Sequence, residues 1–203
     1  MGLITELFSS PMTFLLKLSG LIISITIHEF AHAITAYKLG DNTPKLQGRV
    51  TLNPLAHLDL VGSILMLVLG FGWGKPVEYD VYNLRHPKRD TGLISFAGPI
   101  SNILLGIILI FLSRFFGIQE FMPVAYINFF LAFFNLIPIY PLDGFNVVLS
   151  ILPYDLAMRW RETEKYSLIF ILVLVFTNIT SIIISPISTF LLVTIDSFVK
   201  IFL

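Results

Sequence analysis

The chain has 203 residues, of which 56% are hydrophobic and 13% charged, and its mean hydropathy is +0.85. An average soluble domain is about 25% charged, so this composition predicts an integral membrane protein. A formal net charge of zero gives no indication of nucleic-acid binding, and the absence of cysteine excludes disulfides, thiolate metal sites and a cysteine nucleophile.

The first apolar run, residues 11–39, is long enough to cross a bilayer core of ~30 Å as a helix. Pro11 suits a first helical turn, and Gly40 suits the point where the helix ends. No basic segment with a short apolar core and a small-residue cleavage site precedes the run, so we expect no signal peptide. The run contains the segment His28-Glu29-Phe30-Ala31-His32. Ionisable groups are costly at such depth and indicate function.

The next part of the chain, residues 41–82, differs from a simple span. Residues 49–52 and 76–82 alternate apolar and polar side chains, which is typical of short strands. Between them, residues 57–73 form an apolar stretch that several glycines interrupt. This stretch is marginal for a full crossing and suits a re-entrant segment, which enters the membrane and leaves on the same side.

Further apolar runs follow. Residues 92–116 and 123–137 are each predicted to cross the membrane. At 138–141 the sequence Pro-Ile-Tyr-Pro breaks the helix, because proline lacks an N–H donor. Such a break at membrane depth is tolerated where it lines a cavity or is covered by protein. After a polar segment, residues 166–185 and 186–203 are predicted as two more spans.

The predicted fold is therefore an all-α polytopic membrane protein. It has about five full transmembrane helices, the re-entrant segment 57–73 and a small membrane-associated β element. No internal repeat is visible, so residues 1–203 are interpreted as one membrane-embedded domain. Its core covers about 12–150, and residues 166–203 form a C-terminal transmembrane pair.

The distribution of Lys and Arg gives this fold an orientation, because cytoplasmic loops are enriched in both. If residues 57–73 cross the membrane fully, the basic residues of the loops divide eight to four between the two sides. If the segment is re-entrant, they divide eleven to one. The stronger asymmetry favours the re-entrant arrangement in the cell (inner or plasma) membrane. The N-terminus then lies outside, the C-terminus is cytoplasmic, and the active site faces the cytoplasmic side.

The histidines at 28 and 32 lie four residues apart, so both can reach one zinc ion from one helix face, with Glu29 placed to hold a zinc-bound water. A catalytic zinc takes three protein ligands and keeps one open position. The candidates for the third ligand are His57, Asp59, Glu78, Asp80, His86, Asp143, Asp155 and Asp196. His32 lies about 12 Å inside the cytoplasmic end of its helix. Asp143 follows a helix that runs to the same face and lies in the proline-broken stretch, so it is the best-placed carboxylate.

Three spaced motifs occur along the chain. They are His28-Glu29-Phe30-Ala31-His32, Ala97-Gly98-Pro99 with Asn102, and Asn135-Leu136-Ile137-Pro138-Ile139-Tyr140-Pro141-Leu142-Asp143-Gly144. Over about residues 20–150, and in this order, they resemble the site-2 proteases, the intramembrane zinc metalloproteases of peptidase family M50. The chain resembles a minimal member without PDZ or CBS domains. Phe145 stands where many relatives have a second glycine, and we expect it to alter the packing beside Asp143 without abolishing activity.

The resemblance implies a zinc-dependent metalloendopeptidase that carries out regulated intramembrane proteolysis, the hydrolysis of peptide bonds in transmembrane proteins. It implies that His28, His32 and Asp143 bind one zinc ion, which activates a water molecule, and that Glu29 is the general base. Asn135 matches the family's asparagine eight residues before the aspartate, and we expect it to help bind the substrate or the oxyanion. The expected partners are the lipid bilayer and a transmembrane substrate that another protease has trimmed first.

Two features each have two interpretations. The segments 49–52 and 76–82 offer an edge to which an unwound substrate adds as a strand, in contact with Val77, Tyr79 and Val81. Alternatively, they form a small hairpin that only packs on the catalytic helices. His57 is either a partner or gate at the metal site or, in the interpretation we favour, a histidine that satisfies a turn.

Two other classes of membrane protein use similar ligands. A prenyl-protein endopeptidase would use a glutamate as third ligand on a separate helix, and no span after 11–39 carries a glutamate at catalytic depth. A metal transporter or sensor would need acidic or histidine residues along both halves of the membrane, and the outer halves hold almost none. Both observations favour the protease.

Overall fold

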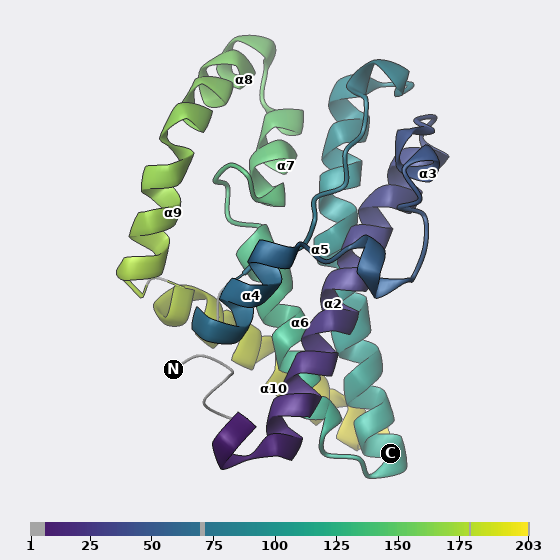
Figure 1. Ribbon diagram of the computed structural model, residues 1–203, viewed down its shortest axis with the longest axis vertical. Coiled ribbons are helices and arrows are strands. Elements are labelled where there is room, and N and C mark those ends of the chain that lie inside the picture. Colours follow the sequence, from purple (N-terminus) through teal and green to yellow (C-terminus); the bar gives the residue numbers. More distant parts are fainter. Residues whose placement is uncertain (1–6, 70–71, 179, 203) are drawn as a thin grey trace.

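The computed structural model describes residues 7–69, 72–178 and 180–202. Helices and turns make up these residues, and Figure 1 shows them in chain order from purple to yellow. The α-helices are α2 (Pro11–Lys38), α3 (Thr43–Leu46), α4 (Leu60–Leu69), α5 (Pro87–Phe116), α6 (Phe121–Asn135), α7 (Asp143–Ile151), α8 (Tyr154–Arg161), α9 (Ser167–Phe176) and α10 (Ser185–Phe202). Short turns of 3-10 helix are η1 (Pro54–Ala56), η2 (Val81–Asn83) and η3 (Glu162–Tyr166), and η4 (Thr180–Ile184) is a π-helical turn.

Helices α2, α5 and α6 pack against one another at the centre of the molecule (Figure 1). Both α2 and α5 begin with a proline, whose missing N–H would have no partner at a helix start anyway. α5 ends at Gly117, which adopts the left-handed conformation with φ 72°. Two glycines let α6 approach closely. A Cβ on Gly20 of α2 would lie 2.8 Å from Val124, and one on Gly106 of α5 would lie closer than 3.0 Å to Phe129.

Among the described residues, three helical stretches are long and apolar enough to cross a membrane: Pro11–Lys38, Pro87–Phe116 and Ser181–Phe202. Helix α6 has 15 residues and α9 has 10, whereas a crossing needs about 20. The structure is therefore that of a multi-pass helical membrane protein, but the expected five full spans are not confirmed.

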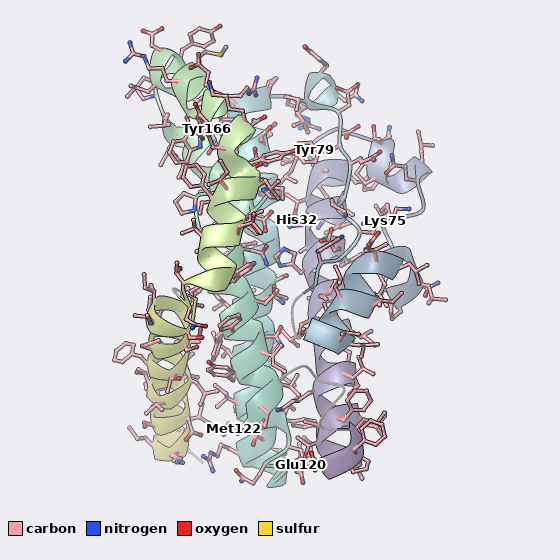
Figure 2. The ribbon with its side chains drawn as sticks, turned by 60° about the vertical axis from the view of Figure 1, so that its left-hand side comes forward. His32, Lys75, Tyr79, Glu120, Met122 and Tyr166 are labelled. Atoms are coloured by element: carbon pink, nitrogen blue, oxygen red, sulfur yellow. The ribbon has the colours of Figure 1, made fainter. Side chains whose placement is uncertain are left out.

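The last two helices, α9 and α10, differ from the expected antiparallel pair. Figure 2 shows α9, with Tyr166 at its upper end, above α10, so the two helices follow one another in the same direction. Asp196 on α10 accepts hydrogen bonds from Nε and a terminal nitrogen of Arg114 at 2.5 and 2.8 Å. Arg114 lies in the last turn of α5. The end of α10 therefore lies beside the α5–α6 turn, near Glu120, and at the opposite end from Tyr166 (Figure 2).

The reason for this difference lies in residues 177–178 and 180–184. Asn178 has a left-handed φ of 52°, and η4 follows as a π-helical turn. Together they bend the chain between α9 and α10 without reversing it. The expectation of two antiparallel spans over 166–203, with the chain ending beside the polar loops, is therefore wrong.

Residues 57–69, which include α4, and residues 72–75 lie together as the two sides of a hairpin. Leu58 pairs with Gly74 in an isolated antiparallel bridge, and the N–H of Lys75 donates to the carbonyl of His57 at 2.8 Å. Both ends of the segment therefore lie at the same level. This return of the chain is the geometry expected of a re-entrant segment. We call residues 72–75 the return arm.

The expected β element does not form in the described residues, where the one bridge is that of Leu58. Residues 49–52 make no strand, and the N–H of Arg49 donates to the carbonyl of Pro44 in a local turn. Residues 76–82 are not paired as a strand either. The Asp80 carboxylate accepts the N–H of Tyr82 at 2.9 Å and so starts η2. Local turns thus use the backbone groups that a hairpin would need.

Candidate metal centre

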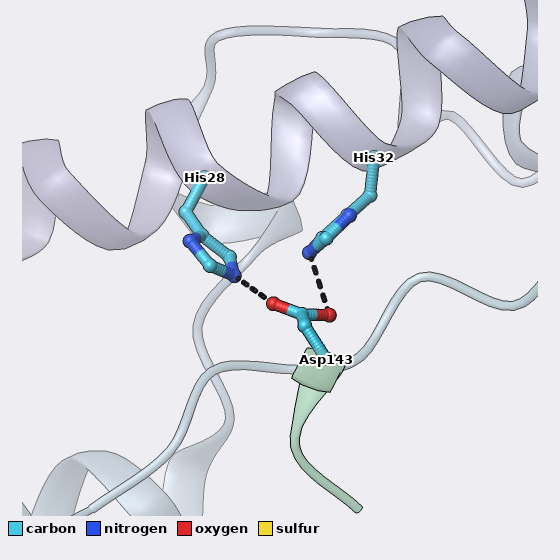
Figure 3. Close-up of side chains that lie close together, drawn as sticks. All are labelled: His28, His32 and Asp143. Atoms are coloured by element: carbon cyan, nitrogen blue, oxygen red, sulfur yellow. Dashed lines mark ion pairs between the residues drawn. The ribbon is translucent and has the colours of Figure 1, made fainter. Parts of the chain in front are cut away.

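His28, His32 and Asp143 come together although Asp143 lies far along the chain. His28 Nε2 lies 3.0 Å from Asp143 Oδ2, and His32 Nε2 lies 3.2 Å from Asp143 Oδ1 (Figure 3). One ligand atom from each of the three residues lies within 4.8 Å of the others. The structure therefore unites the three residues that the sequence pointed to as zinc ligands.

Helix α5 holds the far ring nitrogens of both histidines. His28 Nδ1 donates to Asn102 Oδ1 at 2.5 Å, and His32 Nδ1 donates to the carbonyl of Ile94 at 2.7 Å. Because both partners are acceptors, each Nδ1 carries a proton. Partners of this kind fix the tautomer and the ring orientation of histidines in metal sites. Each Nε2 is therefore left to face the carboxylate of Asp143.

Asn102 is itself held by a buried network that reaches α2 and α6. Its Nδ2 donates to the Ser24 carbonyl at 3.0 Å and to Asn128 Oδ1 at 2.9 Å, which leaves Oδ1 for His28. The amide of Asn128 donates in turn to the Val124 carbonyl at 2.9 Å. Ser24, Asn102 and Asn128 are fully buried. The network fixes the orientation of the asparagine that orients His28.

Gly98 on α5 makes room for the two histidine rings. A Cβ at this position would lie closer than 3.0 Å to the Nε2 atoms of both His28 and His32. Any larger side chain would occupy the space in front of the two nitrogens. The glycine of the Ala97-Gly98-Pro99 motif is therefore required for the geometry of the site.

Asp143 is presented by the first turn of α7, after the irregular chain that the prolines create. A carboxylate is favourable at a helix N-terminus because it faces the positive end of the helix dipole. A Cβ on Gly144 would lie closer than 3.0 Å to the carbonyl of Leu136, so glycine is needed directly after the ligand. Phe145 is 1% exposed and stacks on Trp160, with ring centroids 5.6 Å apart. It therefore changes the packing beside Asp143 by anchoring α8.

The three residues fit a zinc ion. Two imidazole nitrogens and one carboxylate oxygen are a donor set of catalytic zinc sites, which keep a fourth position open. With both Nδ1 atoms protonated, neutral imidazoles turn two lone pairs toward a carboxylate that also offers only lone pairs. Asp143 Oδ2 is buried and has no hydrogen-bond donor. A cluster made of acceptors alone needs a cation.

Glu29 lies beside this cluster on α2, three residues before His32, which places both on neighbouring positions of the helix surface. It faces the return arm, since a Cβ on Gly74 would lie 3.4 Å from Glu29 Oε1. Its Oε2 is buried without a hydrogen-bond partner and lies 3.7 Å from a terminal nitrogen of Arg49. The position suits a base that acts on a water at the metal.

A cavity of about 800 Å³ opens next to the site. It extends along α2 and α6, and the return arm and α9 also contribute to its wall. Its lining includes Ile25, Gly74, where a Cβ would lie 3.4 Å from Glu29 Oε1, and Leu142, the residue before Asp143. Most of its other lining side chains are apolar, among them Leu21, Met66, Ile127, Phe130, Leu131, Phe134 and Ile171.

Asn135 lines the same cavity at the end of α6. Its Nδ2 donates to the carbonyl of Leu131 at 2.9 Å, one turn earlier in the helix. Asn135 is therefore placed to meet a molecule in the cavity, and its role in catalysis stays a prediction.

The segment that carries Val77, Tyr79 and Val81 lies toward the end of the molecule where Tyr166 is found (Figure 2). Tyr79 packs against buried Ala36 and Ile94, and burial raises the pKa of its hydroxyl. Tyr79 and Val81 line a second, smaller cavity of about 370 Å³ together with parts of α5, α7 and α8. The three residues form no strand edge, so that part of the expectation is wrong.

His57 agrees with the interpretation that we favoured, because the residue is fully buried and its Nε2 lies 2.7 Å from the Thr51 carbonyl in the preceding turn. Sequence reasoning missed Arg49, which is buried beside Glu29. It also missed the carbonyl of Ile94, because every residue has a backbone carbonyl and the amino-acid sequence does not show which one binds a histidine. Nothing in the sequence indicated a role for Asn128 except that it is a polar residue in an apolar run.

Comparison with known proteins connects these residues to a protein family. Residues 116–178 match the family model of peptidase family M50. The chain is 39% identical over 180 residues to "Putative zinc metalloprotease YwhC" of Bacillus subtilis, covering 82% of each chain. It is 30% identical over 177 residues to "Putative zinc metalloprotease Rip2" of Mycolicibacterium smegmatis, covering 81% of this chain and 68% of that one.

A more distant similarity links the chain to "Zinc metalloprotease MJ0392" of Methanocaldococcus jannaschii. The two are 28% identical over 137 residues, which is 65% of this chain and 33% of the other. No solved structure matches the chain at a significant level.

Proposed function

Because the chain belongs to peptidase family M50, the site-2 protease family, and is a zinc metalloendopeptidase, we propose that it cleaves transmembrane segments of other proteins inside the bilayer. One observation supports this proposal above the others. The His28, His32 and Asp143 cluster is buried among the helices of a membrane protein, and the neighbouring residues Leu142 and Gly74 line an apolar cavity. A site of this kind suits a substrate that arrives through lipid.

The chemistry is assigned to four side chains. His28, His32 and Asp143 would hold zinc, which when bound polarises a scissile carbonyl and lowers the pKa of a water to about 7. Glu29 accepts a proton from the attacking water and passes it to the leaving amide nitrogen. The same carboxylate therefore serves first as general base and then as general acid. Asn102 keeps the His28 ring in place throughout.

The substrate segment would lie in the larger cavity. A helix hides its peptide groups in internal hydrogen bonds, so the segment has to unwind before a peptide bond can reach the site. The cavity is lined by Lys17, Leu21 and Ile25 along α2 and by Gly74, which lies beside Glu29. Its volume of about 800 Å³ suits one stretch of chain, and the proposed substrate is one that another protease has trimmed first.

Asn135 and the segment 77–81 are assigned to substrate contact within this proposal. Asn135 lines the larger cavity close to the irregular chain that precedes Asp143. An amide there can bond the backbone or the oxyanion of an unwound segment. Tyr79 and Val81 line the smaller cavity, and Val77 lies between them and the return arm. Contact there would be made by side chains, since no strand edge is offered.

The proposed orientation follows from the basic residues. In Figure 2, Tyr79 and Tyr166 lie toward one end of the molecule, Lys75 lies level with His32, and Glu120 lies at the opposite end. Arg114 lies in the last turn of α5, which leads to Glu120. Lys200 joins Arg114 at that end, because both contact Asp196. Most of the other Lys and Arg residues lie in the loops of the first end, which we assign to the cytoplasm of a cell membrane. Residues 57–75 would then be re-entrant from the cytoplasmic side, and α2 would start and α10 would end on the outer side.

The test uses the purified chain in phosphatidylglycerol–phosphatidylcholine vesicles with a dye-labelled single-pass peptide that carries a helix-weakening Gly-Gly step. We expect one zinc per chain and cleavage of the peptide. Glu29→Gln should keep zinc while cleavage falls by about 10²–10⁴-fold. Glu120→Gln, an exposed change at the far end of the molecule, should leave cleavage unchanged.

Two outcomes would contradict the proposal. Cleavage by Glu29→Gln at nearly the wild-type rate would remove Glu29 as the base. A wild-type chain that is folded, free of zinc and inert toward the peptide would remove the metalloprotease assignment.

A further inference from the structure

Arg49 is a buried cation that the chemistry described so far does not use. It lies in the loop between α3 and η1, and 3% of its surface is exposed. The loop is otherwise at the surface, with Gln47 and Gly48 exposed just before it. Taking a guanidinium out of water is costly unless its donors find acceptors. The fold therefore maintains this burial for a reason.

The partners of Arg49 come from two separate parts of the active site. A terminal nitrogen donates to the carbonyl of Lys75 in the return arm. The same nitrogen lies 3.7 Å from Glu29 Oε2. Arg49 thus bridges the return arm and the catalytic helix α2.

The contacts of Arg49 leave hydrogen-bonding atoms unpaired, both on Arg49 and on Glu29. Arg49 Nε and Glu29 Oε2 are both buried and lack hydrogen-bond partners. Among the described residues, Glu29 is the carboxylate that forms an ion pair with Arg49. Burial lowers the pKa of the Arg49 guanidinium, and the charges of Glu29 and Glu78 oppose this effect. A cation held this close favours one placement of the Glu29 carboxylate over others.

The return arm closes the other side of Glu29. Gly74 lies against this carboxylate, since a Cβ there would lie 3.4 Å from Oε1. Glu29 is therefore enclosed between Gly74 and Arg49, and Arg49 also binds the residue that follows Gly74. One guanidinium can set both the direction of the carboxylate and the distance of the arm from it.

We propose that Arg49 is a positioning residue, which holds the Glu29 carboxylate in its working orientation and fastens the return arm against it. This inference rests on the proposed function, because it takes Glu29 as the base. The competing explanation is that Arg49 only fastens the arm, through its bond to Lys75. The two differ in what they predict for kcat.

The test measures kcat and KM for the single-pass Gly-Gly peptide in vesicles, together with the zinc content. We expect Arg49→Gln to bind one zinc per chain and to lose about 10–100-fold in kcat, with KM changed by less than about threefold. Arg49→Lys keeps the positive charge but loses the planar set of guanidinium N–H donors. Its kcat should therefore lie between those of Arg49→Gln and the wild type. Lys45→Gln removes an exposed cation from the neighbouring helix α3 and should change neither constant.

A second measurement follows the arm without using activity. The chain has no cysteine, so Lys75→Cys introduces a single thiol while the carbonyl at this position is kept. We expect its labelling by a soluble maleimide to speed up when Arg49→Gln is added, and not when Lys45→Gln is added.

These measurements distinguish the positioning of Glu29 from fastening of the arm alone. If Arg49→Gln raises KM or speeds the labelling of Lys75→Cys while kcat is unchanged, Arg49 does not position Glu29. If Arg49→Gln does not fold, Arg49→Lys is the variant that tests the proposal. A wild-type kcat in Arg49→Lys would show that the guanidinium donors are not needed to position Glu29, and would overturn the proposal. If Glu29→Gln abolishes cleavage while both Arg49 variants keep wild-type kcat, this inference fails and the proposed function stands. If Glu29→Gln cleaves normally, the proposed function fails first.

Discussion

Charged side chains lie among the helices at two levels of the molecule, and the two clusters differ in how completely their hydrogen bonds are made. At the far end, Asp196 accepts from Arg114 Nε at 2.5 Å and from a second Arg114 nitrogen at 2.8 Å. Lys200 contacts the same carboxylate at 2.8 Å. Every oxygen of Asp196 therefore has a donor.

The cluster at the site is different. Asp143 Oδ2, Glu29 Oε2 and Arg49 Nε are buried without hydrogen-bond partners. An unpaired polar group in a buried place costs free energy, so a native chain keeps few of them. We therefore interpret the Asp196 cluster as one that holds the helices together and the cluster at the site as one kept for binding and chemistry. Changes at the site should remove zinc or activity, and changes at the far end should alter stability alone.

The largest effect is expected for Gly98→Ala. Its new Cβ would lie closer than 3.0 Å to the Nε2 atoms of His28 and His32, so the rings would have to turn away from the metal. We expect at least about a 100-fold loss of zinc affinity, measured by competition with a chelating dye, because ligand orientation is disturbed directly.

Gly106→Ala is the matched control on the same helix. Its Cβ would press on Phe129 in the core instead of on the ligands. Thermal unfolding should show a loss of about 1–3 kcal/mol from overpacking, with one zinc per chain retained. If Gly98→Ala bound zinc as tightly as Gly106→Ala, the glycine would not be required for the site.

A smaller effect is expected for Asn102→Leu, which removes the acceptor for His28 Nδ1, so that no hydrogen bond fixes the orientation of the imidazole ring. Loss of such a partner weakens metal binding by about 10–100-fold. Asn128→Leu removes only the next link and should weaken binding less. The same zinc competition measures both, and equal losses would show that the network acts through packing rather than through the orientation of His28.

The smallest effect on zinc and cleavage is expected for Asp196→Asn. It weakens the bonds to Arg114 and should cost about 1–3 kcal/mol in the free energy of unfolding. Lys200→Gln removes an exposed partner and should cost less than about 1 kcal/mol. Zinc content and kcat should stay at the wild-type values in both variants. A loss of zinc in Asp196→Asn would break the distinction between the two clusters.

The sequence was sufficient to predict the cluster of His28, His32 and Asp143, because each of these residues has a strong chemical signature. His28 and His32 recur at helical spacing in an apolar run, and the prolines before Asp143 mark a broken helix. The glycines in 57–73 similarly indicated a chain that turns back. The antiparallel bridge between Leu58 and Gly74 shows this return.

Other parts could not be derived from pattern. Alternation in residues 76–82 looks like a strand, but a strand needs a partner, and the turn at Asp80 ends the segment first. Hydropathy is uniform over 166–203 and gives no sign that Asn178 bends the chain without reversing it. Arg49 stands alone in a loop, and its burial depends on contacts with residues that are distant in sequence.

We infer that the incomplete cluster at the site binds zinc. X-ray absorption at the zinc edge of the purified chain, with Asp143→Ala measured alongside, identifies the ligands of the metal. We expect one zinc per chain, bound by two imidazole nitrogens and oxygen donors at about 2.0–2.2 Å, and loss of most of the zinc in Asp143→Ala. A wild-type chain without zinc, or a ligand shell that Asp143→Ala leaves unchanged, would contradict it.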